Sequence, residues 1–222
     1  MRTISNVRLA IGVPCSFPQV PVSFFNSFTL MEKPSFQFIT ADNGAIDVLR
    51  NDIVEKALSI DVTKLIMLDV DQVYAKDTIT KLLKHKHPVV GAMVHRRYPP
   101  FDPIIMKATG DRYDPIEDYE PGSLVECDAT GTGCIMYDME VFKKLPYPWF
   151  KFIKNPDNGM VIGEDIGLCQ ELKAAGYPIY VDTSVEIGHL STMIVNGATH
   201  RLYKAMKCKQ QKKNEALGFM GK

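Results

Sequence analysis

The stretch LIMLDVDQV, residues 65–73, decides the fold of this chain of 222 residues. Its first four residues are apolar, as in a strand buried on both faces, and two aspartates follow directly. Asp69 and Asp71 are two residues apart in an extended segment, so their side chains point to the same side while Val70 points to the other. A buried strand that ends in two carboxylates is typical of a parallel sheet that binds a ligand at the carboxyl ends of its strands.

Strands and helices alternate on both sides of this stretch. Apolar runs predict the strands and helical periodicity predicts the helices, with Asp77 as the N-cap of the third helix. In order along the chain, the predicted elements are a strand at 7–13, a helix at 22–33, a strand at 36–40, a helix at 46–58, a strand at 64–69, a helix at 77–85 and a strand at 87–94. This alternation predicts an α/β fold with a mostly parallel central sheet flanked by helices.

Beyond residue 95 the pattern is less regular. An edge strand is predicted at 103–108, and the segment from Asp111 to Asp128 is rich in turns and holds seven acidic residues against one basic residue. The remaining predicted elements are two strands joined by the glycine turn TGTG and followed by a helix (125–145), a loop (145–163), a helix ended by Gly176, the short strands 178–182 and 185–189, and a helical tail from Thr199.

Composition excludes several classes of protein. Apolar residues make up 45% and charged residues 23%, as in a soluble globular protein. Lys plus Arg and Asp plus Glu both number 26, which excludes a chain that is basic throughout. The five cysteines form no C-x-x-C pair, which favours a reducing compartment and a cytoplasmic protein. The uncharged stretch 9–31 contains three prolines, so no transmembrane segment is predicted there.

Further polar residues follow in a fixed order. Glu164 and Asp165 open a predicted helix, and His189 ends a predicted strand. Each has a common structural explanation, because acidic residues often offset a helix dipole and a lone histidine is often a core residue. A D-x-D pair, a glycine turn, an E-D pair and a histidine in this order are much less expected by chance. Paired carboxylates suit Mg²⁺ or Mn²⁺ together with a diphosphate.

With these motifs the sequence resembles the glycosyltransferases of the GT-A fold, most of all the short family-2-type enzymes of bacteria and phages. The resemblance covers about residues 45 to 190 and depends on the order and spacing of the motifs. The matching stretches are VLRNDIVEKAL (48–58), LIMLDVDQVYAKDTITKLLKHKHPVVGA (65–92), VECDATGTGCIMYDMEVFKKL (125–145), GEDIGLCQELKAAGYPIYVD (163–182) and IGHL (187–190).

The resemblance implies a metal-dependent transfer of a sugar from a UDP- or GDP-sugar to an acceptor hydroxyl, with inversion at the anomeric carbon. Asp69, Asp71 and His189 would hold Mn²⁺ or Mg²⁺, with Asp69 also contacting the nucleotide. Asp165 would be the general base, and Glu164 would orient it or the acceptor.

The resemblance also implies contacts to the donor and acceptor. Arg50 and Asn51 would hold the nucleotide, with Pro14 and Asp42 nearby, although a solvated helix face explains Arg50 equally well. Donor sugar or acceptor would meet a set of small residues and one aromatic residue, namely Gly131, Thr132, Gly133 and Trp149. A tight turn explains the glycines as well, and packing beneath a loop explains the tryptophan. Arg96 and Arg97 follow a strand, either toward phosphate or as surface charge.

The implied domain is 1–200, with a nucleotide-binding half at 1–94 and an acceptor and catalytic half at 95–200. The basic tail 201–222 carries seven Lys or Arg residues against one Glu, a net charge of +6 that offsets −6 in the rest of the chain. A glycan, a protein, a lipid carrier and modified phage DNA all remain open as acceptors. The sequence does not indicate an oligomeric state.

Three alternatives remain. In a haloacid-dehalogenase-like phosphatase, which shares the D-x-D strand, Asp69 would be the nucleophile and Asp71 the acid. Two βα units precede that strand here, and Cys169 occupies a position where a further aspartate is expected. A nucleotidyltransferase would need a basic, glycine-rich loop after the first strand, in place of VPCSFPQVP. A non-catalytic module that binds a nucleotide or a glycan is the third alternative.

Overall fold

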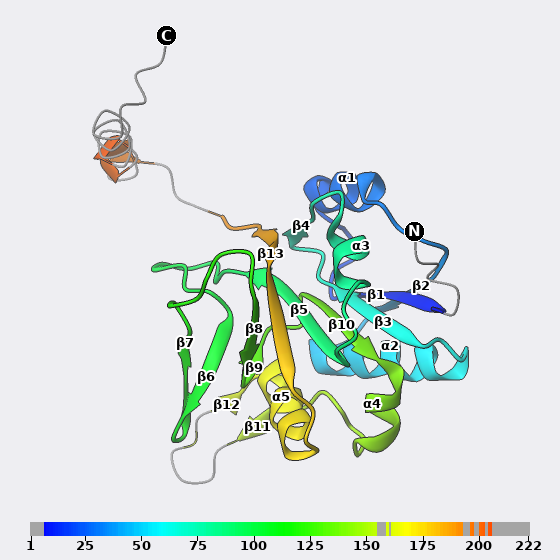
Figure 1. Cartoon of the computed structure of the whole chain (residues 1–222). Helices are drawn as coiled ribbons and strands as arrows, with labels where there is room; N and C mark the ends of the chain where they lie inside the picture. The colour runs from blue at the N-terminus through cyan, green and yellow to red at the C-terminus, as the bar shows by residue number, and fades with distance from the viewer. Residues whose placement is uncertain are drawn as a thin grey trace. The chain divides into compact units, whose positions relative to one another are not determined.

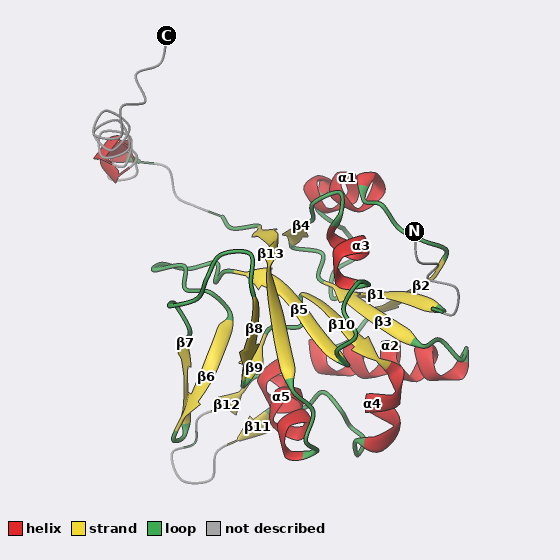
Figure 2. Ribbon diagram, in the orientation of Figure 1, coloured by secondary structure: helices red, strands yellow, loops and turns green. Residues whose placement is uncertain are grey.

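The computed structural model describes residues 7–154, 159, 161–192, 196–197, 200–202 and 204–205. The chain divides into two compact units, Met1–Leu190 and Ser191–Lys222. Most of the predicted basic tail lies outside the described residues, and those described between 200 and 205 are helical. The first unit carries all the elements discussed below and has an α/β fold (Figures 1 and 2).

A mixed eight-stranded sheet forms the centre of this unit, in the order β2-β1-β3-β10-β5-β13-β4 with β8 also paired to β13. Its strands are β1 (Leu9–Cys15), β2 (Phe36–Asp42), β3 (Lys64–Leu68), β4 (Gln72–Val73), β5 (Val89–Val94), β8 (Leu124–Cys127), β10 (Cys134–Asp138) and β13 (Ile179–His189). The four strands predicted in the first hundred residues are present as β1, β2, β3 and β5, and they run in one direction with β13.

The prediction of a mostly parallel sheet is wrong. β10 lies between β3 and β5 and runs antiparallel to both, while β4 and β8 run antiparallel to β13. The apolar run 134–138 predicts a buried strand but contains no signal for its direction, which the topology of the whole chain sets. The predicted short strands 178–182 and 185–189 form a single strand, β13, with an irregular register between Asp182 and Glu186.

Helices cover both faces of the sheet (Figure 1). They are α1 (Val22–Leu30), α2 (Ile46–Ser59), α3 (Thr78–Leu82), α4 (Met139–Lys144) and α5 (Glu164–Ala174). Apolar residues of α2, α4 and α5 join one core cluster, and those of α1 and α3 join the other. Asp77 precedes α3 as predicted but makes no capping hydrogen bond, and its carboxylate pairs with Lys81 at 3.1 Å instead.

Close packing of α2 on the sheet requires a glycine in β1. A Cβ atom at Gly12 would lie 2.4 Å from Cγ2 of Ile53 on α2, well inside van der Waals contact. Ile53 is fully buried, so neither group has room to move. This packing fixes the distance between α2 and the sheet near the carboxyl end of β3, where the candidate site lies.

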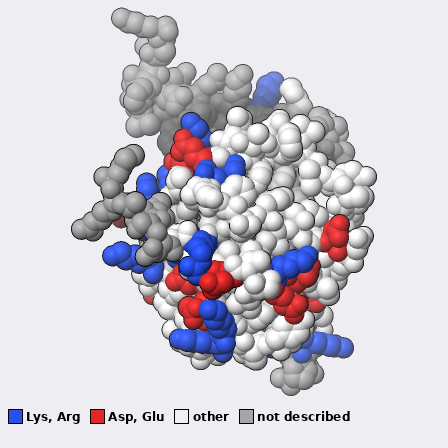
Figure 3. Space-filling model, turned by 90° about the vertical axis from the view of Figure 1, so that its right-hand side faces the viewer, with Lys and Arg blue, Asp and Glu red and all other residues white. Residues whose placement is uncertain are grey.

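Two small sheets flank the central one. β6 (Ile105–Thr109), which is the predicted edge strand, pairs with β7 (Arg112–Pro115) and β9 (Ala129–Thr130), and β11 (Ile153–Lys154) pairs with β12 (Val161–Ile162). On the face that Figure 3 shows, basic and acidic side chains lie in small mixed groups around a broad area that carries neither. Within the described part of the chain, no helix is long and apolar enough to cross a membrane.

Candidate functional site

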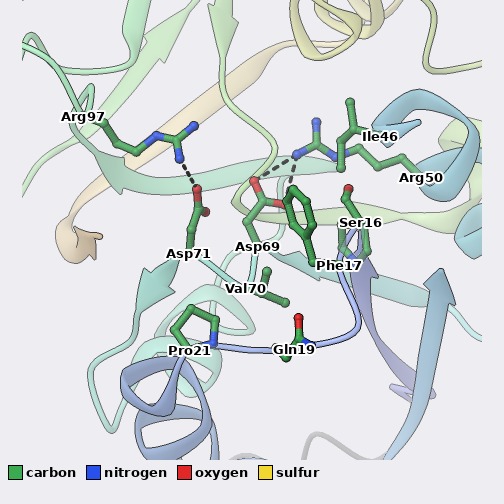
Figure 4. Close-up of a pocket in the computed structure, with 11 residues that line it drawn as sticks. Ser16, Phe17, Gln19, Pro21, Ile46, Arg50, Asp69, Val70, Asp71 and Arg97 are labelled. Atoms are coloured by element: carbon green, nitrogen blue, oxygen red, sulfur yellow. Dashed lines mark hydrogen bonds and ion pairs between the residues drawn. The ribbon is translucent and has the colours of Figure 1, made fainter. Parts of the chain in front are cut away.

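The site lies where the order of the strands changes direction along the chain. β1 has β2 on one side and β3 on the other, so the loops after β1 and β3 leave the sheet next to each other. Such a switch point opens a crevice at the carboxyl ends of parallel strands. A pocket of about 610 Å³, the β1 pocket, lies there (Figure 4) and is lined by Pro14, Ser16, Phe17, Gln19, Pro21, Ile46, Arg50, Asp69, Val70, Asp71 and Arg97.

Arg50 on α2 reaches the first aspartate of the D-x-D pair. Its Nη2 atom lies 3.0 Å from both carboxylate oxygens of Asp69, and its Nη1 atom donates to Oε1 of Glu164. Arg50 is only 4% exposed, so it does not belong to a solvated helix face. Burial alone would lower the pKa of Arg50, but the charges of Asp69 and Glu164 outweigh burial and raise it. Arg50, Asp69 and Glu164 are called the Arg50 group below.

Glu164 lies at the N-terminus of α5 and is buried. Burial raises the pKa of its carboxyl, and the neighbouring Arg50 opposes that rise. Among the described residues that line the three cavities of this section, Glu164 is absent. Its carboxylate therefore joins α5 to α2 through Arg50, and the predicted orientation of the base or acceptor by Glu164 would act through that link.

The second aspartate has a different set of partners. Oδ2 of Asp71 lies 2.8 Å from Nη1 of Arg97 and 3.4 Å from Nε2 of His189. Burial alone would raise the pKa of Asp71, but the hydrogen bond and charge of His189 and the charge of Arg97 lower it. Asp71, Arg97 and His189 are called the Asp71 group. Figure 4 shows Arg97 reaching Asp71 from one side while Arg50 reaches Asp69 from the other.

Backbone pairing fixes this second group. β4 pairs with the end of β13, which sets His189 opposite Gln72, and the N–H of Leu190 donates to the carbonyl of Asp71 at 2.8 Å. Nδ1 of His189 lies 2.8 Å from the carbonyl oxygen of His95. Because that carbonyl accepts the Nδ1 hydrogen, Nε2 is directed toward Asp71. Burial alone would lower the pKa of His189, but the hydrogen bond to Asp71 outweighs burial and raises it, which favours a protonated Nε2 that donates to Asp71.

A cation that replaces the Nε2 proton of His189 would meet two acceptors, the imidazole nitrogen and the carboxylate of Asp71. The carboxylate of Asp71 suits Mg²⁺ or Mn²⁺, and the imidazole of His189 shifts the preference toward the transition metal. These two residues therefore fit the predicted metal. Across the described residues, no three His, Cys, Asp or Glu side chains come together as a preformed metal site. Asp69, the third predicted ligand, forms its ion pair with Arg50 instead.

The glycine turn packs under the D-x-D pair. The carbonyl oxygen of Gly133 accepts hydrogen bonds from the N–H of Asp69 at 2.8 Å and from the hydroxyl of Tyr74 at 3.1 Å. A Cβ atom at Gly133 would lie 2.0 Å from Nε2 of the buried Gln72 and 3.0 Å from Oδ2 of Asp69. Close approach to two polar side chains therefore requires glycine at this position.

Most of the predicted site residues meet around one cavity of about 140 Å³, the central cavity. It joins residues from α2, the end of β3, β4, the glycine turn, α5 and β13, and its lining extends along the sequence from Arg50 to His189. Its lining consists of Arg50, Asp69, Asp71, Gln72, Val94, Arg97, Ile104, Gly131, Thr132, Gly133, Asp165 and His189.

Asp165 lines the central cavity but not the β1 pocket. Its Oδ1 atom accepts the N–H of Ile166 at 2.8 Å, and burial raises the pKa of its carboxyl despite the opposing effect of Arg50. Asp165 also lines a pocket of about 650 Å³, the β7 pocket. The whole lining is Arg96, Arg97, Tyr98, Ile104, Met106, Asp111, Arg112, Tyr113, Asp114, Val161, Ile162, Gly163, Asp165, Ile166 and His189.

Asn51 does not reach these cavities. Its amide nitrogen donates to the carbonyls of Asp47 and Phe150, and its amide oxygen accepts the N–H groups of Trp149 and Phe150. All hydrogen-bonding positions of this side chain are thus used to hold the loop 149–150 against α2. The position of Asn51 gives it a structural role in place of the predicted nucleotide contact.

Trp149 is a core residue. It is buried, its Nε1 atom donates to the carbonyls of Phe142 and Leu145, and its ring meets that of Phe142 edge-on at 5.6 Å between centroids. The alternative explanation, packing beneath the loop, therefore describes Trp149 better than the predicted contact with a sugar.

The two remaining predicted nucleotide contacts are Pro14 and Asp42, at the ends of β1 and β2. Pro14 lines the pocket at the end of β1. Asp42 is exposed at the end of β2, where it pairs in register with Cys15, and Asn43 donates to its carboxylate at 3.2 Å. Burial, and then the charge of Asp42, raises the pKa of Cys15. Asp42 thus lies one strand away from the residues that line the pocket.

Sequence reasoning missed two residues. Gln72 lines the central cavity and Tyr74 supports it from below, with its hydroxyl donating to the carbonyl of Asp69 at 2.7 Å. Their only signal is their place directly after the D-x-D pair. The sequence leaves both phosphate binding and surface charge open for Arg97, and the structure places it at Asp71.

Comparisons with known proteins show a similarity of fold and no similarity of sequence family. No protein-family profile matches the sequence, and no curated protein matches it. Among solved structures, the crystal structure of A197 from STIV is similar, with a TM-score of 0.53 and 15% sequence identity over 85% of this chain and 97% of that one. At this level of identity the similarity shows a shared α/β fold alone.

Proposed function

We propose that the first unit is a GT-A domain that transfers a sugar from a nucleotide-diphosphate sugar to an acceptor hydroxyl, with inversion. One observation carries this proposal: two pockets, each larger than 600 Å³, share walls with a small polar cavity between them. The D-x-D aspartates line the β1 pocket, and Asp165 lines the β7 pocket. A transfer reaction needs this arrangement, because donor and acceptor must approach one reacting carbon from opposite sides.

The β1 pocket is proposed to hold the donor. Its base and ribose would lie against the loop after β1, and its diphosphate would lie near Asp71, Arg97 and His189. Asp71 and His189 would hold Mn²⁺ or Mg²⁺, which, when bound, neutralises charge on the departing diphosphate. Arg97 adds a second positive charge on the same side, at a distance of 2.8 Å from Asp71.

Asp165 is proposed as the general base. As the acceptor oxygen attacks the anomeric carbon, the bond from that carbon to the diphosphate breaks, and the acceptor proton passes to the carboxylate of Asp165. The raised pKa of Asp165 suits this role, since a base is most effective when its pKa approaches the working pH.

The Arg50 group is proposed to support the site without touching the acceptor. Arg50 holds Asp69 with both carboxylate oxygens engaged, and the same guanidinium holds Glu164, the residue before the proposed base. Loss of Arg50 would thus disturb both sides of the central cavity together.

The phosphatase alternative fits this geometry less well. A nucleophilic Asp69 would need an accessible carboxylate oxygen, whereas both oxygens accept from Arg50. Asp71, the acid in that mechanism, has a lowered pKa and so does not hold a proton near neutral pH.

The test is binding and turnover of nucleotide sugars by the full chain. UDP-, GDP- and CDP-sugars would be screened by thermal shift with and without Mn²⁺, and donor hydrolysis would then be followed by release of the nucleoside diphosphate. We expect a metal-dependent shift with one base, weakened in Asp71→Asn.

Asp165→Asn should bind the donor normally but lose transfer by at least about a hundredfold, because the proton acceptor is removed. Lys143→Met, at an exposed position of α4, is the control and should change nothing. Absence of binding to any nucleotide sugar would refute the proposal. Binding without turnover would favour a non-catalytic module. A product with retained configuration would show that Asp165 is not the general base of an inverting transfer.

A further inference from the structure

The β7 pocket identifies the class of acceptor, on the premise that the proposed function is correct. We infer that the acceptor is a neutral carbohydrate chain, seated with one hydroxyl group at Asp165. Four classes of acceptor are open on sequence grounds, and they differ in charge and in apolar surface. The lining of the pocket separates a carbohydrate from a lipid carrier and from nucleic acid on these two properties.

The charges in the lining balance. Arg96, Arg97 and Arg112 face the pocket together with Asp111, Asp114 and Asp165. A pocket for nucleic acid or for a polyprenyl phosphate would present an excess of positive charge, because phosphate groups dominate the affinity for such ligands. Sugar hydroxyls both donate and accept hydrogen bonds, so they use arginine donors and aspartate acceptors equally.

Two tyrosines supply the apolar faces that a sugar ring needs. Tyr98 follows β5 and is 71% exposed, and Tyr113 lies on β7 and is half-buried. A phenol ring combines an apolar face with a polar tip and loses little conformational freedom when it packs against a ring. Exposure of a large aromatic side chain in a pocket otherwise rich in charges indicates a ligand that covers it.

The remaining lining fits a lipid tail less well. Its aliphatic side chains are Ile104, Met106, Val161, Ile162 and Ile166, and they share the pocket with six arginine and aspartate side chains. A tail would need a continuous apolar groove, since each charge buried against it without a partner is costly. The volume, about 650 Å³, lies in the range that suits a ligand of a few sugar rings.

The experiment measures binding and transfer separately on the full chain. Saturation-transfer NMR, without donor, would report binding of neutral hexose di- and trisaccharides. Transfer assays with the identified nucleotide sugar would compare those saccharides with sialylated oligosaccharides, undecaprenyl phosphate and single-stranded DNA containing hydroxymethylcytosine. We expect binding and transfer with at least one neutral saccharide and with none of the anionic acceptors.

Two variants locate the site. Tyr98→Ala should weaken saccharide binding at least about threefold, because the ring loses its stacking surface. Tyr147→Ala, which removes an exposed tyrosine outside the described lining of the pocket, should leave binding unchanged. Since Tyr98 is exposed, its replacement should leave the melting temperature within about a degree or two of the parent protein.

The outcomes separate the two proposals. If the donor binds and is hydrolysed but transfer occurs only to an anionic acceptor, or if no saccharide binds, the neutral-carbohydrate inference is overturned while the proposed function stands. If saccharides bind in a manner sensitive to Tyr98 and no nucleotide sugar binds, the proposed function fails and the carbohydrate site remains. Equal effects of the two tyrosine variants would also overturn the inference.

Discussion

The two aspartates of the D-x-D pair are neighbours in sequence, yet they belong to groups of opposite character. In the Arg50 group the side chains of Arg50 and Glu164 are less than a tenth exposed, and both oxygens of Asp69 are engaged. In the Asp71 group, Arg97 is 44% exposed and Asp71 about a third exposed. A buried ion pair is difficult to break, whereas an exposed one exchanges its partners at little cost.

This difference suggests a division of labour. The Arg50 group joins α2, β3 and α5 and so holds the two halves of the proposed catalytic domain together. Asp71 and Arg97 of the Asp71 group line the β1 pocket, where, under the proposed function, a cation and a diphosphate would replace one ion pair with another. The predictions below test this contrast in stability and in binding.

The largest effect is expected for Arg50→Met, which leaves the buried carboxylate of Glu164 and the partly buried carboxylate of Asp69 without their counter-charge. The free energy of unfolding should fall by about 3–5 kcal/mol, measured by urea denaturation monitored by circular dichroism. Arg97→Met is the matched control, because the same substitution in the Asp71 group should cost less than about 1 kcal/mol. Equal losses in the two variants would show that the two groups do not differ as described.

A second variant tests whether the loss comes from uncompensated charge. Adding Glu164→Gln to Arg50→Met removes one of the stranded carboxylates, so the double variant should recover part of the lost stability. A double variant less stable than Arg50→Met would show that Glu164 contributes through packing rather than through its charge.

The next effect concerns the glycine turn beneath Asp69. Gly133→Ala places a methyl group against the buried Gln72 amide and the Asp69 carboxylate, so we expect a loss of about 1–3 kcal/mol in unfolding free energy. Gly131→Ala is the control: its Cβ would meet Ile104 at 3.5 Å, an ordinary contact, and should cost less than about 1 kcal/mol. A smaller loss for Gly133→Ala than for Gly131→Ala would refute the close-approach argument.

The contrast between the groups was hidden from sequence analysis for a physical reason. LIMLDVDQV predicted strand β3 and the placement of both aspartates at its carboxyl end, because periodicity and burial are local properties. The partners of the two aspartates come from α2, from the segment after β5 and from β13, and only the packed fold brings them together. Arg50 shows this most clearly, since its burial follows from the close packing of α2 on Gly12 and not from its neighbours in sequence.

The same limit explains the errors. The direction of β10 depends on the route of the chain after residue 95, where turns and acidic residues replace the regular alternation. Trp149 and Asn51 belong to motifs that look functional, yet they hold each other: the amide of Asn51 accepts the N–H of Trp149. Local patterns predict elements and strand ends well, but they do not predict which polar side chains are used up within the core.

Asp128, a carboxylate outside the site, allows the stabilisation from an ion pair to be measured for comparison. The carboxylate of Asp128 accepts the N–H of Ala108 and pairs with Lys107 and Lys173, which connects β6 to α5. Burial alone would raise the pKa of Asp128, but the Ala108 N–H and the two lysines outweigh it and lower that pKa to about 2. Because the pKa is lower in the folded state, the stabilisation is complete above about pH 4 and is lost as the pH falls toward 2.

Asp128→Asn should therefore lower the unfolding free energy by about 1–2 kcal/mol at pH 7, after allowance for the exposure of Lys107. The difference from the parent protein should shrink between pH 4 and pH 2, as followed by urea denaturation across that range. A difference that does not vary with pH would show that the lost contacts are steric and not electrostatic.

The smallest effect is on cation binding at the Asp71 group, and it tests the exchange of partners directly. Arg97 places a positive charge 2.8 Å from Asp71, so it competes with any cation there. Arg97→Met should raise the affinity for Mn²⁺ alone by up to about fivefold, measured by electron paramagnetic resonance of unbound Mn²⁺ without nucleotide. Arg50→Lys, which keeps the charge in the buried group, should leave Mn²⁺ affinity within about twofold. If Arg97→Met instead weakened Mn²⁺ binding, Arg97 would be positioning Asp71 for the metal. The Asp71 group would then be as fixed as the Arg50 group.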